Sequence, residues 1–268
     1  MTPPVDFAVT RRAFLGRYAG GLGSLVARHL VSRHGVRRTA AKGCHAVTFS
    51  ENPSKLGWPS IHTDYWDPFW QACSDEGIVV CLHIGSSSQV VVTAADAPIN
   101  VMISLQPMNI VQAAADILWS RLLVKFPDVK LALSEGGIGW IPYFLERAEQ
   151  VLDKQRHWVK KGQTFMDHGG NSGADLDTLD IRATFRDHVF GCFIHDEHGI
   201  ASLDEIGEDN VMCETDYPHS DSTWPDCIDS ARDLVKDLTP EVQYKLLRGN
   251  AEKLYRFQAA EPPALVPA

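Results

Sequence analysis

Several short apolar runs in the sequence end in a side chain that could bind a metal ion or move a proton. His83 ends the run Ile-Val-Val-Cys-Leu-His, Glu135 ends Leu-Ala-Leu-Ser-Glu, and Asp216 ends Val-Met-Cys-Glu-Thr-Asp. Imidazole and carboxylate groups bind divalent metals, and a carboxylate can also accept a proton from metal-bound water. We therefore predict that His83 and Asp216 bind a metal ion and that Asp216 and Glu135 are catalytic.

Each of these residues also has an ordinary structural explanation. A single histidine in an apolar run is often a core residue that bonds the backbone, and an aspartate before a turn often bonds its own turn. Glu135 precedes two glycines and a predicted helix, so a role at the helix N-terminus explains it as well as catalysis does. The ligand interpretation of His83 is favoured because polar groups end the other runs too.

Polar residues beside these run ends are predicted to contact a substrate. Glu51, Asn52 and Lys55 follow the first run and precede a group of aromatic residues. This composition suits an aromatic or carboxylate-bearing ligand, although aromatics at such spacing more often form a core. His195 follows the fourth run, and His219 follows the fifth, where it either shares the site or caps the next loop.

The runs are predicted strands, and segments with helical periodicity separate them. Alternating strands and helices predict a parallel α/β sheet, in which functional side chains collect at the carboxyl ends of the strands. The clearest predicted helices span residues 108–126 and 138–159, and two more span about 225–235 and 241–257. The predicted strands are residues 44–50, 78–84, 129–135, 188–194 and 210–216.

Charge and cysteine content exclude several classes of function. The 268 residues include 25 basic and 34 acidic residues, and the net charge of -9 would repel nucleic acid and anionic membranes. The six cysteines form no Cys-x-x-Cys pair, which favours a reduced, cytoplasmic compartment. Arg11-Arg12 is reminiscent of a twin-arginine export signal, but further basic residues interrupt the apolar segment, so export is not expected. The longest uncharged stretch, residues 78–95, is too polar for a membrane span.

Composition also divides the chain into three parts. Residues 1–36 are basic and contain one acid, Asp6, whereas the rest of the chain is acidic and regularly patterned. We predict an atypical N-terminal segment at residues 1–36, either disordered or foreign to the fold. A barrel domain is predicted at residues 37–257 and a flexible tail at residues 258–268.

Four motifs together resemble one enzyme family. They are Leu82-His83-Ile84-Gly85, then Ser134-Glu135-Gly136-Gly137-Ile138-Gly139-Trp140-Ile141-Pro142, then Glu214-Thr215-Asp216-Tyr217-Pro218-His219, and finally Gly249-Asn250-Ala251-Glu252-Lys253-Leu254-Tyr255. In this order, over residues 37–257, they resemble the amidohydrolase-related family of metal-dependent TIM barrels. That family includes aminocarboxymuconate-semialdehyde decarboxylase, resorcylate-type decarboxylases and lactone hydrolases.

The resemblance implies a (β/α)8 TIM barrel with one divalent metal ion, commonly Zn²⁺ with Mn²⁺ as the other candidate, at His83 and Asp216. The family has a histidine where this chain has Glu135. It also has a His-x-His pair on the first strand, which has no counterpart near this N-terminus, so we expect a barrel that is incomplete at the N-terminus.

The function implied is that of a hydrolase or non-oxidative decarboxylase acting on a small carboxylated, cyclic or aromatic substrate. The alternative is a catalytically impaired barrel remnant or a non-catalytic partner of a full-length paralogue. The resemblance leaves a homodimer open.

Overall fold

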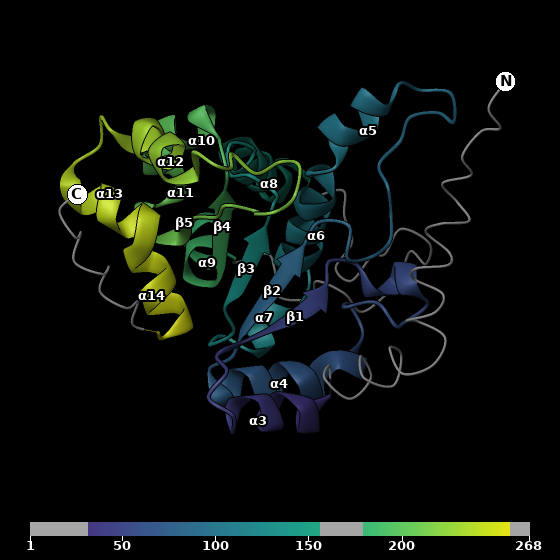
Figure 1. The fold of residues 1–268 in the computed structure, drawn as a ribbon. Helices are drawn as coiled ribbons and strands as arrows, with labels where there is room; N and C mark the ends of the chain where they lie inside the picture. Colours follow the sequence, from purple (N-terminus) through teal and green to yellow (C-terminus); the bar gives the residue numbers. More distant parts are fainter. Residues whose placement is uncertain (1–31, 156–178, 258–268) are drawn as a thin grey trace, which may run out of the picture.

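A parallel sheet forms the centre of the computed structural model, which describes residues 32–155 and 179–257 (Figure 1). The strands lie side by side in chain order, so that β1 and β5 are the two edges among the described residues. The bounds are Ala46–Ser50 for β1, Val79–His83 for β2, Leu131–Ser134 for β3, Val189–Phe193 for β4 and Val211–Cys213 for β5. All five predicted strands and the α/β class are confirmed.

Helices connect the strands, as parallel pairing requires. Before β3 lie α3 (Arg33–Ala40), the short 3-10 turns η1 (Pro53–Leu56) and η2 (Asp64–Trp66), α4 (Asp67–Glu76), α5 (Ile99–Leu105), α6 (Met108–Leu118) and α7 (Leu122–Lys125). Between β3 and β5 lie α8 (Ile141–Gln155), α9 (Ile181–His188), α10 (Glu197–Ala201), α11 (Leu203–Ile206) and η4 (Glu208–Asn210). After β5 come α12 (Cys227–Val235), α13 (Pro240–Tyr244), one π-helical turn η5 (Lys245–Gly249) and α14 (Asn250–Tyr255).

The predicted helix over residues 108–126 is two helices in the structure. The break falls at Ser120, whose hydroxyl donates to the carbonyl oxygen of Ile117 at 2.8 Å and accepts from the amide of Leu122 at 3.2 Å. This side chain ends α6 and begins α7 by bonding backbone groups that a continuous helix would use itself. The apolar spacing continues across the break, so periodicity alone did not reveal it.

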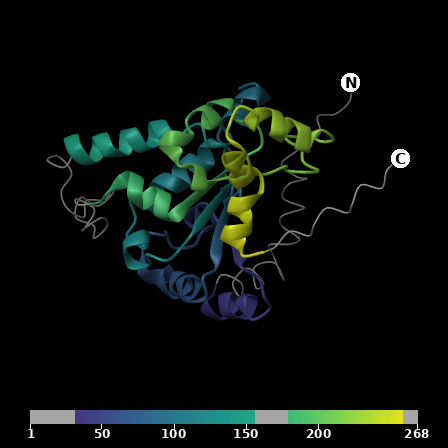
Figure 2. The ribbon, with the colours of Figure 1, turned by 90° about the vertical axis from the view of Figure 1, so that its left-hand side faces the viewer.

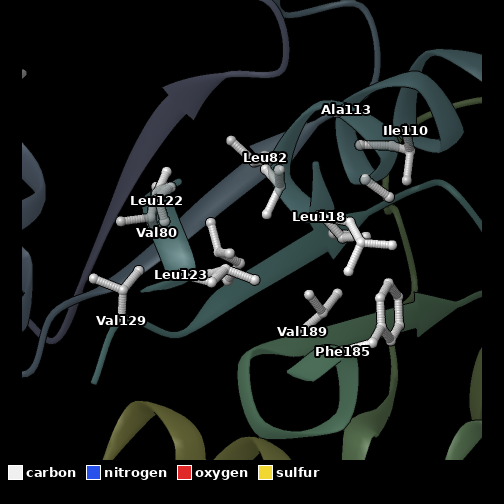
Figure 3. Packing of buried hydrophobic residues seen from close by; sticks show 14 of the residues in the cluster. Val80, Leu82, Ile110, Ala113, Leu118, Leu122, Leu123, Val129, Phe185 and Val189 are labelled. Carbon is white, nitrogen blue, oxygen red and sulfur yellow. The ribbon is translucent and has the colours of Figure 1, made fainter. Parts of the chain in front are cut away.

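One face of the sheet is covered by helices. Side chains alternate between the two faces of a strand, so Val80 and Leu82 of β2 point to the same side as Leu131 and Leu133 of β3. They pack in one buried cluster with residues of α4, α6, α8 and α9. Figure 3 shows Ile110 of α6 among the side chains of this cluster, which holds the strands in place beneath their functional ends.

The other face carries a smaller cluster. Val79, Ala132, Cys192 and Met212 are buried there, and the C-terminal helix α14 packs against them through residues that include Leu254 and Tyr255. In Figure 2, α14 (yellow) and α8 (teal) lie on opposite sides of the strands. This is the face that would line the interior of a closed barrel, and in the described residues α14 covers part of it.

One predicted domain boundary can be compared with the structure. The predicted domain boundary at residue 37 falls inside α3, where Val36 is completely buried. Gly35 and Val36, which precede this boundary, therefore pack with the domain. Residues 1–31, the end of the predicted helix beyond residue 155, and the predicted tail at residues 258–268 lie outside the described residues.

One described stretch, Ile99–Leu118, is long and apolar enough for a membrane span by length and composition. It consists of α5 and α6, and α6 buries Ile110, Ile117 and Leu118 in the core. A core helix passes the same test, so the stretch is weak evidence for a membrane span.

Candidate acid-base site

Three side chains of the predicted site meet at the carboxyl edge of the sheet. His83 ends β2, Glu135 directly follows β3, and Asp216 lies three residues beyond β5. The Nε2 atom of His83 is 2.7 Å from Oε1 of Glu135, and the Glu135 carboxyl hydrogen-bonds the side chain of Asp216. The structure therefore joins these groups in one chain of contacts, in the order His83, Glu135, Asp216.

Both carboxylates of this chain lie on unusual backbone. Glu135 has a φ of 59° and Asp216 a φ of 50°, in the left-handed region that side chains other than glycine rarely adopt. Such a conformation costs about 1 to 3 kcal/mol and persists only where the surroundings enforce it. Strained residues of this kind gather at functional sites, so their presence at two of the three groups supports a functional role.

Glu214 holds Glu135 in this conformation. Its Oε1 atom accepts a hydrogen bond from the backbone amide of Glu135 at 2.7 Å. Burial, together with the nearby Glu135 carboxylate, raises the pKa of Glu214 to about 7, against the lowering effect of that hydrogen bond. Sequence reasoning missed Glu214 as a site residue. The available signal was its position two residues after Met212, which places both side chains on the same face of the sheet.

The surroundings shift the pKa of both members of the closest pair. Burial disfavours the charged form of His83, but the Ile84 carbonyl oxygen, 2.8 Å from Nδ1, and the Glu135 carboxylate outweigh it and raise the pKa. Burial and the hydrogen bond with Asp216 raise the pKa of Glu135, although His83 works in the opposite direction. The protonated form of each group is thus favoured, in Glu135 by burial and the neighbouring Asp216 carboxyl and in His83 by its oxygen partners.

Asp196 fixes the loop that follows Glu135. Its Oδ2 atom accepts from the amides of Ile138 and Gly139, each at 2.7 Å, and its Oδ1 atom accepts from the amide of Gly199 at 2.8 Å. The sequence left open a role for Glu135 at the N-terminus of the following helix, where an anion is favoured. In the structure Asp196 is the carboxylate that bonds these amides, and it ties the loop to the first turn of α10.

Glu51 has a similar role beside His83. It is buried, and its two carboxylate oxygens accept hydrogen bonds from the hydroxyls of Ser86 and Ser87. The amide of Glu51 in turn donates to the hydroxyl of Ser86 at 3.0 Å. These contacts connect the end of β1 to the turn that follows His83, and they occupy the oxygens that a substrate would otherwise meet.

The remaining predicted substrate residues are partly or largely exposed. The Nδ1 atom of His219 is 2.9 Å from Oδ2 of Asp216, and its amide donates to the carbonyl oxygen of Asp216 at 2.7 Å, so His219 contacts Asp216 within the turn and both interpretations stay open. His195 is more than half exposed and lies 3.8 Å from Glu197. Asn52 accepts from the hydroxyl of Ser54 at 2.6 Å, and Lys55 is exposed on η1.

Two cavities open near these residues. One of about 350 Å³ is lined by Glu135 and Glu214 together with His195, Asp196 and Asp221, and it gives access to the acid-base site. The other, of about 800 Å³, lies along β1 and is lined partly by the aromatic residues Trp58, Tyr65, Trp66 and Phe69. These aromatic residues thus line a cavity, as a ligand site would require, and they also form core, since Trp66 and Phe69 are buried.

The described residues do not fit a complete metal centre. A catalytic zinc site takes three protein ligands, and no group of three or more His, Cys, Asp or Glu side chains within residues 32–155 and 179–257 is arranged to hold an ion. Both ring nitrogens of His83 already face protein oxygens, those of Glu135 and Ile84. His83 and Asp216 remain the only two ligands predicted from the sequence.

Comparison with known proteins identifies relatives of this architecture. Residues 10–257 match the family model described as amidohydrolase. No curated protein sequence matches the chain.

Solved structures share the fold at low sequence identity. The 5-carboxyvanillate decarboxylase of Sphingomonas paucimobilis is 16% identical, with a TM-score of 0.66, over 84% of this chain and 63% of that protein. The corresponding enzyme of Novosphingobium aromaticivorans, solved with manganese and 4-hydroxy-3-methoxy-5-nitrobenzoic acid, is 16% identical, with a TM-score of 0.62, over 96% and 74% of the two chains. A dihydroxybenzoic acid decarboxylase of Polaromonas sp. JS666 was solved with manganese and 2-nitroresorcinol. It is 18% identical, with a TM-score of 0.56, over 86% of this chain and 68% of that protein. The chain thus spans less than two thirds of the first of these relatives.

Proposed function

Because the chain belongs to the amidohydrolase family, we propose that it acts as a non-oxidative decarboxylase or hydrolase on a small carboxylated substrate with an aromatic or other ring. The observation that carries this proposal is the contact chain from His83 through Glu135 to Asp216. The cavity of about 350 Å³ beside it falls in the size range of small-molecule sites.

In a decarboxylation, the residues of this chain would supply a proton. Glu135 touches both His83 and Asp216, so it can pass a proton along the chain and give it to the substrate. The electron pair of the broken carbon-carbon bond stays on the ring carbon, which takes that proton while carbon dioxide leaves. In a hydrolysis, Asp216 would instead accept the proton of the attacking water, and His219 is placed to hold the carboxylate in position.

Charge in the cavity favours a cation beside such a substrate. The walls carry four acidic side chains, those of Glu135, Glu214, Asp196 and Asp221, against one imidazole, that of His195, so acidic groups outnumber basic ones even though the pKa values of Glu135 and Glu214 are raised. An anionic substrate would enter against this negative charge unless a cation offset it. Relatives solved with manganese make a divalent metal, Zn²⁺ or Mn²⁺, the cation to test, although the described ligands are too few for a complete site.

Elemental analysis of the purified chain tests the metal part of the proposal. About one zinc or manganese ion per chain, lost in both His83→Ala and Asp216→Ala, would support a metal site at these two residues, whereas the unmodified chain without metal would speak against it. The matched controls are His198→Ala and Asp229→Ala, which change exposed residues outside the contact chain and should keep the metal. Retention of metal in all four variants would place the ion elsewhere.

Assays of the same preparations test the catalytic part. Aromatic acids are screened for release of carbon dioxide and lactones for hydrolysis, with Glu135→Gln as the variant expected to lower turnover at least about 100-fold, as removal of a general acid does. Absence of both metal and turnover in the unmodified chain would reject the enzymatic proposal.

The alternative is a member of the family without catalytic activity, either a barrel remnant or a partner of a full-length paralogue. The absence of a three-ligand group among the described residues favours it. Co-purification with a longer homologous chain, and activity only in the mixed complex, would support the partner role.

A further inference from the structure

A cavity of about 460 Å³ lies at the amino edge of the sheet, at the ends of the strands opposite the arrowheads in Figure 1. Its lining comes from the segments where β2, β3, β4 and β5 begin, and from the C-terminal part of α14 with the residue that ends it. The strand β2 alone is about 13 Å long. No lining residue is shared with the cavity beside Glu135, so the two cavities are separate.

Four basic side chains line this cavity, namely Lys130, Arg186, Lys253 and Arg256. Three of them donate to backbone carbonyl oxygens, as Arg256 does to Gly77 at 2.8 Å. Within residues 32–155 and 179–257 none of the four forms an ion pair with a carboxylate. A carbonyl oxygen carries no net charge, so these contacts leave the positive charge of the side chains in place.

The acidic residues of the lining do not cancel this charge. They are Asp128, Asp187 and Asp209, and Asp209 already lies 3.1 Å from Nζ of Lys245, which is not a lining residue. Cations therefore outnumber carboxylates in this cavity, whereas the chain as a whole has a net charge of -9. A concave surface with an excess of one sign of charge attracts a ligand of the opposite sign, in this case an anion.

The backbone at Arg256 supports a binding role. This residue ends α14 with a φ of 53°, in the left-handed region that is unfavourable for side chains other than glycine and that is found most often at functional positions. Its bonds to the carbonyl oxygens of Glu76 and Gly77 both use Nη2, so Nη1 and Nε retain donors for a ligand. A β-carbon on Gly77 would lie 3.3 Å from Nη1, so glycine there leaves room for the guanidinium.

We propose that this cavity binds a small phosphomonoester, with the phosphoryl group held by Lys253 and Arg256. A phosphoryl group carries about -1.5 to -2 charges at pH 7 and has three acceptor oxygens. It can therefore meet several cationic donors at once, whereas a carboxylate has only two oxygens. A guanidinium also forms paired hydrogen bonds with phosphate oxygens, which suits the position of Arg256.

The size and the apolar part of the lining account for the ester. The volume of about 460 Å³ falls within the range of roughly 300 to 1,000 Å³ that is typical of small-molecule sites. Ile78, Phe190 and Leu254 contribute apolar side chains to the lining. An organic group attached to the phosphate can pack against them, and inorganic phosphate alone would leave this surface uncovered.

Isothermal titration calorimetry of the full chain with phenyl phosphate, at constant ionic strength, tests the proposal. We expect saturable binding of one ligand per chain, tighter than that of inorganic phosphate because the phenyl ring covers apolar surface. Lys253→Gln should raise the dissociation constant about 10-fold, since it removes one charge-assisted contact. Lys253 is exposed, so the fold should be retained, and circular dichroism of both proteins checks this.

The matched control is Lys236→Gln, which removes the same charge from an exposed lysine at the end of α12, outside the cavity, and should keep the affinity. His83→Ala should keep it as well. Loss of binding in His83→Ala would place the ligand at the acid-base site and would overturn the proposal. Absence of saturable binding, equal weakening by the two lysine substitutions, or equal affinity for inorganic phosphate would likewise overturn it. These readouts need neither metal nor turnover, so they are independent of the proposed function.

Discussion

At the scale of the residue, the site depends on carboxylates that are already engaged within the protein. Glu51, Asp196 and Glu214 each accept hydrogen bonds that fix the backbone next to His83 or Glu135. A carboxylate that accepts several such bonds stabilises the local backbone more than a neutral acceptor does, because charge-assisted hydrogen bonds are stronger. These three residues therefore support the reactive groups instead of carrying the chemistry themselves.

We predict that Asp196→Asn lowers the free energy of unfolding by about 1 to 3 kcal/mol, because the new amide group cannot accept bonds on both sides and leaves a backbone amide unpaired. Urea unfolding followed by circular dichroism measures the change. Asp229→Asn is the control, since Asp229 lies 3.9 Å from Arg232 on an exposed helix face and should contribute at most about 0.5 kcal/mol. Equal effects of the two substitutions would show that the Asp196 contacts contribute little.

At the scale of the element, close packing between β4 and the segment after β3 holds the site together. Gly191 in β4 has no side chain, and a β-carbon there would lie 2.6 Å from Cγ2 of Ile138, which is completely buried. Ile138 also donates its amide to Asp196. The loop after Glu135 can therefore approach the sheet only because glycine occupies position 191.

We predict that Gly191→Ala destabilises the protein by about 1 to 3 kcal/mol through overpacking, although alanine in place of glycine would otherwise favour a strand. Ile138→Ala alone should cost about 2 to 5 kcal/mol by creating a cavity. The double variant should lose clearly less than the sum of the two, because each change relieves the other. Additive losses in urea unfolding would contradict the contact.

At the scale of the whole molecule, stability should depend on pH through a histidine far from the site. His188 ends α9 and is buried, and its Nδ1 atom is 2.7 Å from the carbonyl oxygen of Val129. Burial lowers the pKa of His188, against the raising effect of that carbonyl. Folding therefore favours the neutral ring, and the unfolded chain binds more protons below about pH 6.5.

The contribution of His188 to stability should consequently be fully present above about pH 6.5 and be lost as the pH drops below that value, opposite in sign to the contribution of Glu214, whose raised pKa favours the folded state as the pH falls. In His188→Asn, which keeps a side-chain nitrogen to donate to Val129, this part of the pH dependence should disappear. Urea unfolding at several pH values between 5 and 8 measures it, with exposed His198→Asn as the control that keeps the slope of the unmodified chain. An unchanged slope in His188→Asn would contradict the assignment.

The sequence by itself determined the strands, the parallel α/β class and the order in which polar groups end the strands. These features follow from local patterns, because apolar runs, glycine and proline act over a few residues. The residues of the family motifs also identified His83, Glu135 and Asp216, which the structure brings into contact.

Only the tertiary structure decided what each carboxylate contacts. Glu51, Asp196 and Glu214 are acids beside strand ends in the sequence, but their partners come from distant segments such as Ser86, Ile138 and Glu135. The break of the helix at Ser120 and the cavity at the amino edge of the sheet depended in the same way on packing that sequence spacing does not encode. Long-range contacts fix these features, so no window of the sequence contains the information that sets them.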